Sequence, residues 1–220
     1  NSKINLIPSG FHFSTDTIPD QKSARFKLKW PEKSKILVVV GRLDPKKRQD
    51  FVWDMFSKRQ AEDEYLIFVG ASTADEAPVF ETDLRVKINA HPKRKSVLWA
   101  GFQDDMQAVY AAADLVVGRA GASTVAEIAT VGIASVLIPW KDAAENHQLT
   151  NAKFLSDQGG AVLLEESRLT DEVFAQQIVE LLTDDAMRMR ISQTARKIGE
   201  VHRNCSIALV VENAAGLVTQ

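Results

Sequence analysis

Short, nearly continuous runs of apolar residues alternate along this chain with longer segments whose apolar residues recur at helical spacing. The runs cover residues 35–40, 65–69, 96–99, 115–117, 134–138 and 161–164, and a further short run lies at residues 4–7. A strand that is apolar on both faces is typical of a parallel sheet covered by helices on each side. The pattern therefore predicts an α/β protein with a Rossmann-like doubly wound parallel sheet of about six strands and helices on both faces.

The segments between the runs predict the helices. Helical spacing is clearest around residues 51–56, 106–110, 173–182 and 187–198, and a last helix is expected over residues 206–218. Thr170 is followed by two acidic residues, a combination typical of a helix start. Residues 8–31 are the most loop-like part of the sequence, and residues 72–78 and 91–95 are expected to form surface loops.

Composition is that of an ordinary globular protein and restricts the partners. The 220 residues carry 27 Lys and Arg against 29 Asp and Glu, a formal charge of −2, which gives no electrostatic reason to expect nucleic acid. This length suits one domain, with an entry segment at residues 1–30 and a β/α core at 31–220.

The same composition bears on the compartment and on metals. No apolar run approaches the roughly 20 residues that cross a bilayer. Cys205 is the only cysteine, so no internal disulfide forms and a cytoplasmic location is expected, without a transmembrane segment. The four histidines are far apart in sequence, which makes a structural metal site improbable.

In a doubly wound sheet, ligands bind where strands end and helices begin, so the loops after the apolar runs are the candidate sites. After the first main run, Gly41 would let backbone approach a ligand closely, and Arg42 and Lys47 would supply positive charge suited to a phosphate. The alternative is a solvated basic turn that enters a helix, and charge alone favours this alternative.

The loop after residues 115–117 has the small residues Ala120, Gly121, Ala122 and Ser123 at a predicted strand-to-helix turn. Their N–H groups and the helix N-terminus would form a site for a diphosphate. The pattern is neither a dinucleotide-binding fingerprint nor a Walker A loop. Glu127 has two interpretations: Thr124-x-x-Glu127 is a capping-box pattern, and a carboxylate beside a phosphate site could bind ribose hydroxyls. Taken alone, capping is favoured.

The loop after residues 134–138 leads into a predicted helix that begins with polar side chains. Gln148 and Asn151 share one helical face, and their amides could read sugar hydroxyls without charge. The alternative is an ordinary polar helix start with His147 merely exposed.

The order of these motifs is more specific than any one of them. Residues 101–128, followed by the Pro139 loop and Gln148-x-x-Asn151-Ala152, resemble the C-terminal donor-binding domain of GT-B glycosyltransferases. Over residues 96–160 the resemblance is to the family of peptidoglycan N-acetylglucosaminyltransferases that make lipid II. Residues 1–60, with Gly41-Arg42-Leu43-x-x-x-Lys47, are similar instead to the glycogen-synthase and sucrose-phosphate-synthase type.

The two resemblances differ in detail. In the second type a glycine follows the lysine, where this chain has Arg48, and a glutamate stands eight positions before the second one, where this chain has Arg119 before Glu127. Arg119 agrees with the peptidoglycan-type pattern. The sequence therefore reads as composite, either a divergent member or an engineered join near residues 70–100.

The resemblance implies a role for each motif in binding a UDP-sugar, with no further cofactor and no metal. Arg42 and Lys47 would contact the diphosphate together with Ala120, Gly121, Ala122 and Ser123, Gln103 would lie at the nucleobase, Glu127 would bind the ribose, and Gln148 and Asn151 would contact the donor sugar. In this context the ribose role of Glu127 is favoured over simple capping.

The resemblance also implies a partner. GT-B enzymes bind the acceptor on an N-terminal domain, which this sequence does not contain, so the chain alone is expected to bind donor but transfer little, with the acceptor domain supplied in cis or in trans. Two alternatives stay open: half of a nucleotide-sugar 2-epimerase, or a non-enzymatic artificial scaffold.

Overall fold

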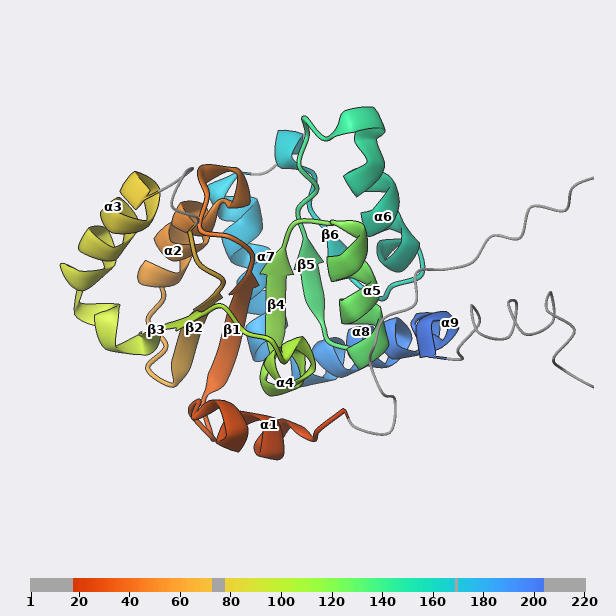
Figure 1. The fold of residues 1–220 in the computed structure, drawn as a ribbon, viewed down its shortest axis with the longest axis horizontal. Helices are drawn as coiled ribbons and strands as arrows, with labels where there is room; N and C mark the ends of the chain where they lie inside the picture. Colours follow the sequence, from red (N-terminus) through yellow and green to blue (C-terminus); the bar gives the residue numbers. More distant parts are fainter. Residues whose placement is uncertain (1–17, 73–77, 169, 204–220) are drawn as a thin grey trace, which may run out of the picture.

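The computed structural model describes residues 18–72, 78–168 and 170–203 (Figure 1). Six strands form one sheet: β1 (Lys35–Val40), β2 (Glu64–Val69), β3 (Val97–Gly101), β4 (Leu115–Gly118), β5 (Ser135–Leu137) and β6 (Val162–Leu163). Their order is β3-β2-β1-β4-β5-β6, and every neighbouring pair is parallel. The predicted doubly wound sheet is confirmed, with each strand placed within two residues of its apolar run.

The strand order reverses direction between β1 and β4. Val38 of β1 pairs with Val116 of β4, while β2 lies on the other side of β1. Ligands of doubly wound sheets bind outside the carboxyl ends of the strands at such a switch point. The loops after β1 and β4 therefore leave the sheet side by side, at the upper edge of the strands in Figure 1.

Helices connect the strands. They are α1 (Gln21–Leu28), α2 (Gln49–Ser57), α3 (Pro78–Asn89), α4 (Met106–Ala112), α5 (Ala122–Val131), α6 (His147–Ser156), α7 (Asp171–Thr183), α8 (Asp185–Ile198) and α9 (Glu200–Arg203). Short 3₁₀ turns lie at η2 (Pro45–Lys47), η3 (Pro92–Ser96), η4 (Ala144–Asn146) and η5 (Glu166–Arg168). Thr170 caps α7 as predicted, since its hydroxyl accepts from Val173 N–H. The expected strand at residues 4–7 and helix at 206–218 lie outside the described residues.

Two segments expected as loops are helical. Residues 92–95 form most of η3, with His91 as its N-cap, and α1 occupies part of the segment 8–31. Asp20 caps α1 by accepting from Ser23 N–H at 2.9 Å. The buried Arg25 then ties the helix to the core, because its Nη2 lies 2.7 Å from Asp114 Oδ2 at the start of β4. This tertiary ion pair explains why α1 forms without a long apolar stripe.

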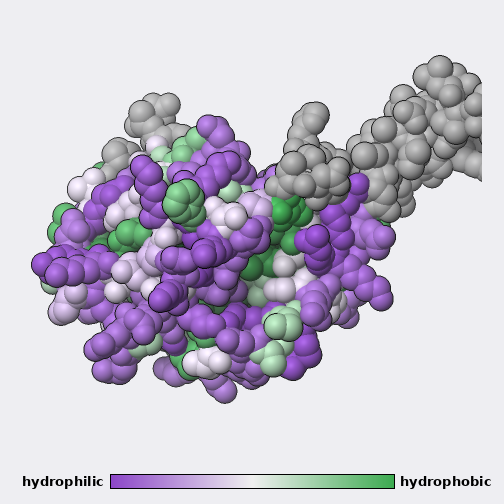
Figure 2. All heavy atoms as spheres, turned by 90° about the horizontal axis from the view of Figure 1, so that it is seen from below, coloured by the Kyte–Doolittle hydropathy of each residue, from purple (hydrophilic) through white to green (hydrophobic). Residues whose placement is uncertain are grey.

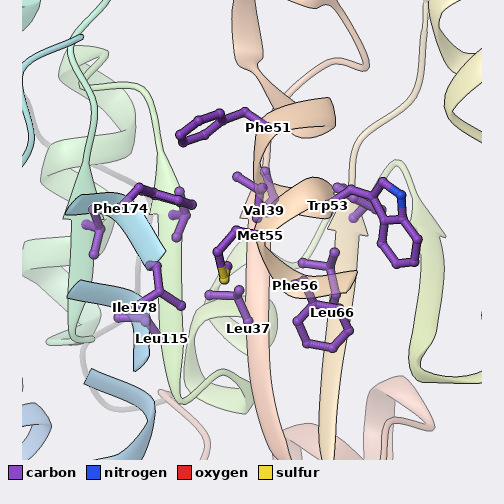
Figure 3. Close-up of a cluster of buried hydrophobic side chains, with 14 of the residues drawn as sticks. Leu37, Val39, Phe51, Trp53, Met55, Phe56, Leu66, Leu115, Phe174 and Ile178 are labelled. Atoms are coloured by element: carbon purple, nitrogen blue, oxygen red, sulfur yellow. The ribbon is translucent and has the colours of Figure 1, made fainter. Parts of the chain in front are cut away.

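Alternate residues of each strand point to opposite faces of the sheet, which gives two cores. Leu37 and Val39 pack with α2, α7 and α8 on one face, and Ile36 and Val38 pack with α1, α4, α5 and α6 on the other. In Figure 1 α7 lies behind the strands, and α4 and α5 lie in front. Figure 3 shows the first core, where the ring of Phe51 lies 4.8 Å from that of Phe174. Each such buried side chain stabilises the fold by about 1.5–3 kcal/mol.

The amino ends of the strands and α1 face the viewer in Figure 2, and hydrophilic side chains cover most of this surface around smaller apolar patches. Within the part of the chain that the structure describes, no helix is both long enough and apolar enough to cross a membrane. The functional residues expected from the sequence lie at the opposite edge of the sheet.

Candidate functional site

The loop after β1 brings two cations to the carboxyl edge of the sheet. Asp44 shapes the loop by accepting from Lys46 N–H at 2.7 Å, which starts the turn η2. Arg42 is exposed, and Lys47 folds back so that its half-buried stem lies over Gly41. Burial, together with repulsion from Arg119 and Arg42, lowers the pKa of Lys47, and Asp44 opposes this effect. Cations so close together favour an anionic ligand.

The N-terminus of α5 lies at the same edge. Its N-cap is Gly121, which offers no side-chain hydrogen bond to the helix. The first N–H groups of an α-helix have no partner inside the helix, and here they belong to the exposed Ala122 and Ser123 and to Thr124. The helix dipole adds partial positive charge at this point. The turn therefore has the donors and the field that suit a phosphate group.

The capping-box interpretation of Thr124 and Glu127 is wrong, because the helix starts earlier than that pattern requires. Thr124 lies inside the first turn of α5 and is not its N-cap, so Glu127 falls on the second turn. Its carboxylate instead meets α4, where the hydroxyl of the buried Tyr110 donates to Oε2 at 2.8 Å. Burial raises the pKa of Glu127, and the hydrogen bond from Tyr110 opposes the rise. Glu127 is thus a half-buried acid one turn along α5 from the N-terminus that suits a phosphate group.

Arg119 is a structural residue of this edge. Its side chain is only 6% exposed, and it donates to the backbone oxygens of Lys46 at 2.7 Å and Ile138 at 3.1 Å. Its Nη2 pairs with Glu166 Oε1 at 2.9 Å. Glu166 also accepts from Lys141 N–H at 3.1 Å. One guanidinium therefore joins the loops after β1, β4, β5 and β6. Sequence reasoning missed Glu166, since no local pattern marks it.

The two amides of α6 face these loops. Gln148 accepts from Trp140 N–H at 3.1 Å, which fixes the loop after β5 and leaves its NH₂ group as a donor. Asn151 donates to Ala120 O at 3.1 Å, which ties α6 to the turn before α5 and leaves its carbonyl oxygen as an acceptor. His147 is exposed, and its Nδ1 lies 2.7 Å from Ala144 O.

A pocket of about 570 Å³ opens beyond the ends of β1, β2 and β3. Gly41, Arg42, Gly70, Phe102 and Gln103 are among its lining residues. Phe102 is 77% exposed at its rim, and Gln103 is held by a hydrogen bond from its Nε2 to Ala100 O at 2.6 Å. Gln103 and Arg42 both line this pocket, and its largely apolar walls suit a planar ring.

The structure thus brings the predicted residues to one edge of the sheet, on the loops after β1, β3, β4 and β5. Arg42, Lys47, Gln103, Ala120, Gly121, Ala122 and Ser123 lie in those loops or at the start of α5, with Glu127, Gln148 and Asn151 on the helices that follow. Among the described residues, no group of His, Cys, Asp and Glu side chains is arranged to hold a metal ion. An anionic ligand with hydroxyl groups fits this edge.

Comparison with known proteins gives a family match and partial relatives. The family model described as "Glycosyltransferase family 28 C-terminal domain" matches residues 35–202. The UDP-N-acetylglucosamine--N-acetylmuramyl-(pentapeptide) pyrophosphoryl-undecaprenol N-acetylglucosamine transferase of Anaeromyxobacter sp. (strain K) is 48% identical over 98 residues, which are 44% of this chain and 26% of that protein. The transferase of the same name from Burkholderia cenocepacia is 46% identical over 111 residues, 49% of this chain and 30% of that protein.

Solved structures agree on the fold. MurG of Acinetobacter baumannii superposes with a TM-score of 0.59 at 27% identity, over 82% of this chain and 50% of that one. Anabaena HepE, solved in complex with UDP and glucose, gives a TM-score of 0.71 at 19% identity, over 94% of this chain and 56% of that one. This chain thus covers about half of these two solved chains and less than a third of the two curated relatives.

Proposed function

Because this chain belongs to the glycosyltransferase family 28 C-terminal domain, we propose that it binds a nucleotide-sugar donor, a UDP-sugar, for hexosyl or N-acetylhexosaminyl transfer. The relatives named as N-acetylglucosamine transferases support this class of donor. The complex of Anabaena HepE with UDP and glucose supports the same ligand chemistry on this fold.

One observation carries the proposal. The cationic loop after β1 and the N-terminus of α5 leave neighbouring parallel strands at the same edge, with Glu127 on the next turn of α5. In this arrangement Arg42, Lys47 and the first N–H groups of α5 neutralise a diphosphate. Glu127 then accepts the ribose hydroxyls, because an ionised carboxylate has several acceptor positions and no competing donor.

The remaining residues bind the nucleobase and the sugar, the two ends of the donor. The nucleobase enters the pocket beside Phe102 and Gln103, where backbone groups of the loop after β3 read its edge. The NH₂ group of Gln148 and the carbonyl oxygen of Asn151 contact the sugar, because the other polar atom of each side chain already forms a hydrogen bond to a loop. The protein supplies binding and orientation here.

Titration calorimetry tests the proposal. We expect the chain to bind UDP and UDP-N-acetylglucosamine more tightly than ADP or GDP, and Glu127→Ala to weaken UDP about tenfold through loss of a charge-assisted contact. Glu32→Ala is the matched control, because Glu32 is an exposed acid near α1 at the opposite edge. Absence of binding for every nucleotide, or equal losses in both variants, would overturn the proposal.

We further propose that transfer needs an acceptor domain, in cis or in trans, with residues 1–220 acting as one donor-binding domain. The resemblance to GT-B glycosyltransferases implies an acceptor side on a separate domain, and the candidate donor-binding residues of this chain lie at one edge of the sheet. A transfer assay with UDP-N-acetylglucosamine should give little product until a candidate acceptor domain is added. Full transfer by the chain alone would refute this second proposal.

A further inference from the structure

Tyr110 reaches from α4 to the single acid of α5. Its ring is fully buried in the core on the α4 and α5 face of the sheet, while its hydroxyl donates to Glu127 Oε2 at 2.8 Å. Phenol hydroxyls in a core need a partner, and here the partner is the acid of the candidate ribose site. The contact therefore connects the rigid core with the ligand edge.

The geometry leaves Glu127 partly available. A carboxylate offers about four lone-pair positions on its two oxygens, and Tyr110 takes one of those on Oε2. Among the described residues, no other hydrogen bond to this carboxylate is formed. Oε1 and the second position of Oε2 therefore accept no hydrogen bond from the described residues, and the phenol helps to fix the plane of the carboxylate. Two open acceptors side by side match two vicinal hydroxyl groups.

We propose that Tyr110 is a positioning residue for the nucleotide's pentose: by holding Oε2 of Glu127, it presents the carboxylate to both ribose hydroxyls and sets the preference for ribose over deoxyribose. This inference rests on the proposed function, since it takes Glu127 as the ribose contact. It adds a residue that does not itself touch the ligand.

The physical reason is the cost of orienting a flexible acid. A Glu side chain on an exposed helix face loses rotamer freedom when a ligand fixes it, and a preorganised side chain has already lost that freedom. The Tyr110 hydroxyl also stabilises the ionised form of Glu127 against the effect of burial. Both effects strengthen contacts to the hydroxyl groups and leave the diphosphate contacts unchanged.

A merely structural role would have a different signature. If Tyr110 only filled the core, loss of its hydroxyl would lower the melting temperature and reduce the affinity for every nucleotide by the same factor. A positioning role changes the ratio of two affinities. The ratio of dissociation constants for UDP and 2′-deoxy-UDP is the sharper readout, because a partly unfolded sample changes both constants equally.

The experiment uses Tyr110→Phe, which removes one hydroxyl and keeps the ring. Tyr65→Phe is the matched control: Tyr65 is half-buried near the amino end of β2 and packs against the same core, away from the ligand edge. We expect the wild-type chain to prefer UDP over 2′-deoxy-UDP about tenfold, and Tyr110→Phe to reduce this preference to about twofold. Tyr65→Phe should leave it unchanged.

A double-variant cycle completes the test. In a Glu127→Ala background, Tyr110→Phe should have no further effect on UDP affinity, because the residue through which it acts is gone. An unchanged ribose preference in Tyr110→Phe, or equal losses with and without Glu127, would overturn the inference while the proposed function stands. A wild-type chain that binds no nucleotide would overturn both.

Discussion

Arg119 and Glu166 form an ion pair across the carboxyl edge of the sheet, with Nη2 of Arg119 2.9 Å from Oε1 of Glu166. Both side chains are nearly enclosed, at 6% and 13% exposure. The pair fixes the backbone of the loops that carry Lys47 and lead to Gln148. The candidate site is therefore held by a residue pair that contacts several loops.

Removing one partner of this pair should be costly. We expect Arg119→Met to lower the free energy of unfolding by about 3 kcal/mol. The variant leaves the enclosed carboxylate of Glu166 with a more distant cation, Arg48 Nη1 at 3.8 Å, and it removes the donor to the carbonyl oxygens of Lys46 and Ile138. Lys27→Met is the control, since its pair with Asp105 is exposed and should contribute less than about 1 kcal/mol. Urea unfolding of both variants measures the difference. Equal losses would show that the buried pair does not hold these loops.

The strands could be predicted because each signal is local. An apolar run such as residues 35–40 is buried on both faces wherever the sheet lies, so its sequence suffices. Helix α1 could not be predicted from local sequence, because it is stabilised by the ion pair between Arg25 and Asp114, which are 89 positions apart. A short helix with few apolar residues is stabilised mainly by tertiary contacts.

The candidate site also has features that local sequence predicts and features that depend on tertiary contacts. The edge on which Arg42 and Glu127 lie follows from the strand order, so the sequence pattern was sufficient for it. The partners of the site residues were not predictable: Tyr110 and Glu127 are 17 positions apart, and Arg119 and Glu166 are 47 apart. The capping box failed because Gly121 starts α5 without a side-chain cap, and no residue pattern marks such a start.

Lys47 should act on the diphosphate alone. We expect Lys47→Met to weaken UDP about tenfold and to leave uridine unchanged, because only UDP offers an anion to the ammonium group. The control is Lys46→Met. The ammonium group of Lys46, the adjacent residue, lies over the Trp140 ring, 5.5 Å from its centre. The UDP effect should diminish at high salt. If uridine and UDP lose affinity equally, Lys47 supports the loop and does not bind phosphate.

Gly70 allows the ends of β1 and β2 to approach each other at the wall of the pocket. Its φ is +130°, and a Cβ atom there would lie 2.1 Å from Gly41 O. We expect Gly70→Ala to lower the free energy of unfolding by about 3 kcal/mol, since backbone must move to admit the methyl group. Gly101→Ala is the control: its φ is +65°, and its Cβ would meet nothing within 4 Å. There only the backbone strain remains, about 1 kcal/mol.

Urea unfolding and UDP titration on the folded variants separate the two glycine effects. Gly70→Ala should also weaken UDP, because the displaced strand end belongs to the pocket. If both glycine variants lose the same stability, the close approach of β1 and β2 is not what requires Gly70.

The raised pKa of Glu127 predicts how nucleoside binding depends on pH. Burial raises this pKa and the Tyr110 hydrogen bond opposes the rise, so the carboxyl group takes up its proton above the ordinary value of about 4.3. The ionised form accepts the ribose hydroxyls, and the protonated form has lost acceptor positions. Uridine affinity should therefore fall as the pH falls through the raised pKa. Uridine is the probe because the terminal phosphate of UDP titrates at about pH 6 and would obscure the titration of Glu127.

The same group should affect folding in the opposite direction. Its folded pKa exceeds the unfolded one, so the folded state holds the proton more tightly, and this contribution to stability is complete below the unfolded pKa and is lost as the pH rises through the folded pKa. Glu127→Gln cannot titrate, and its amide oxygen still accepts from Tyr110. The variant should bind uridine weakly with no pH dependence from this group, and its stability difference from the wild type should change across the same window. If the variant keeps the wild-type pH dependence of uridine binding, another group controls it, and the assignment of Glu127 to the ribose loses its electrostatic support.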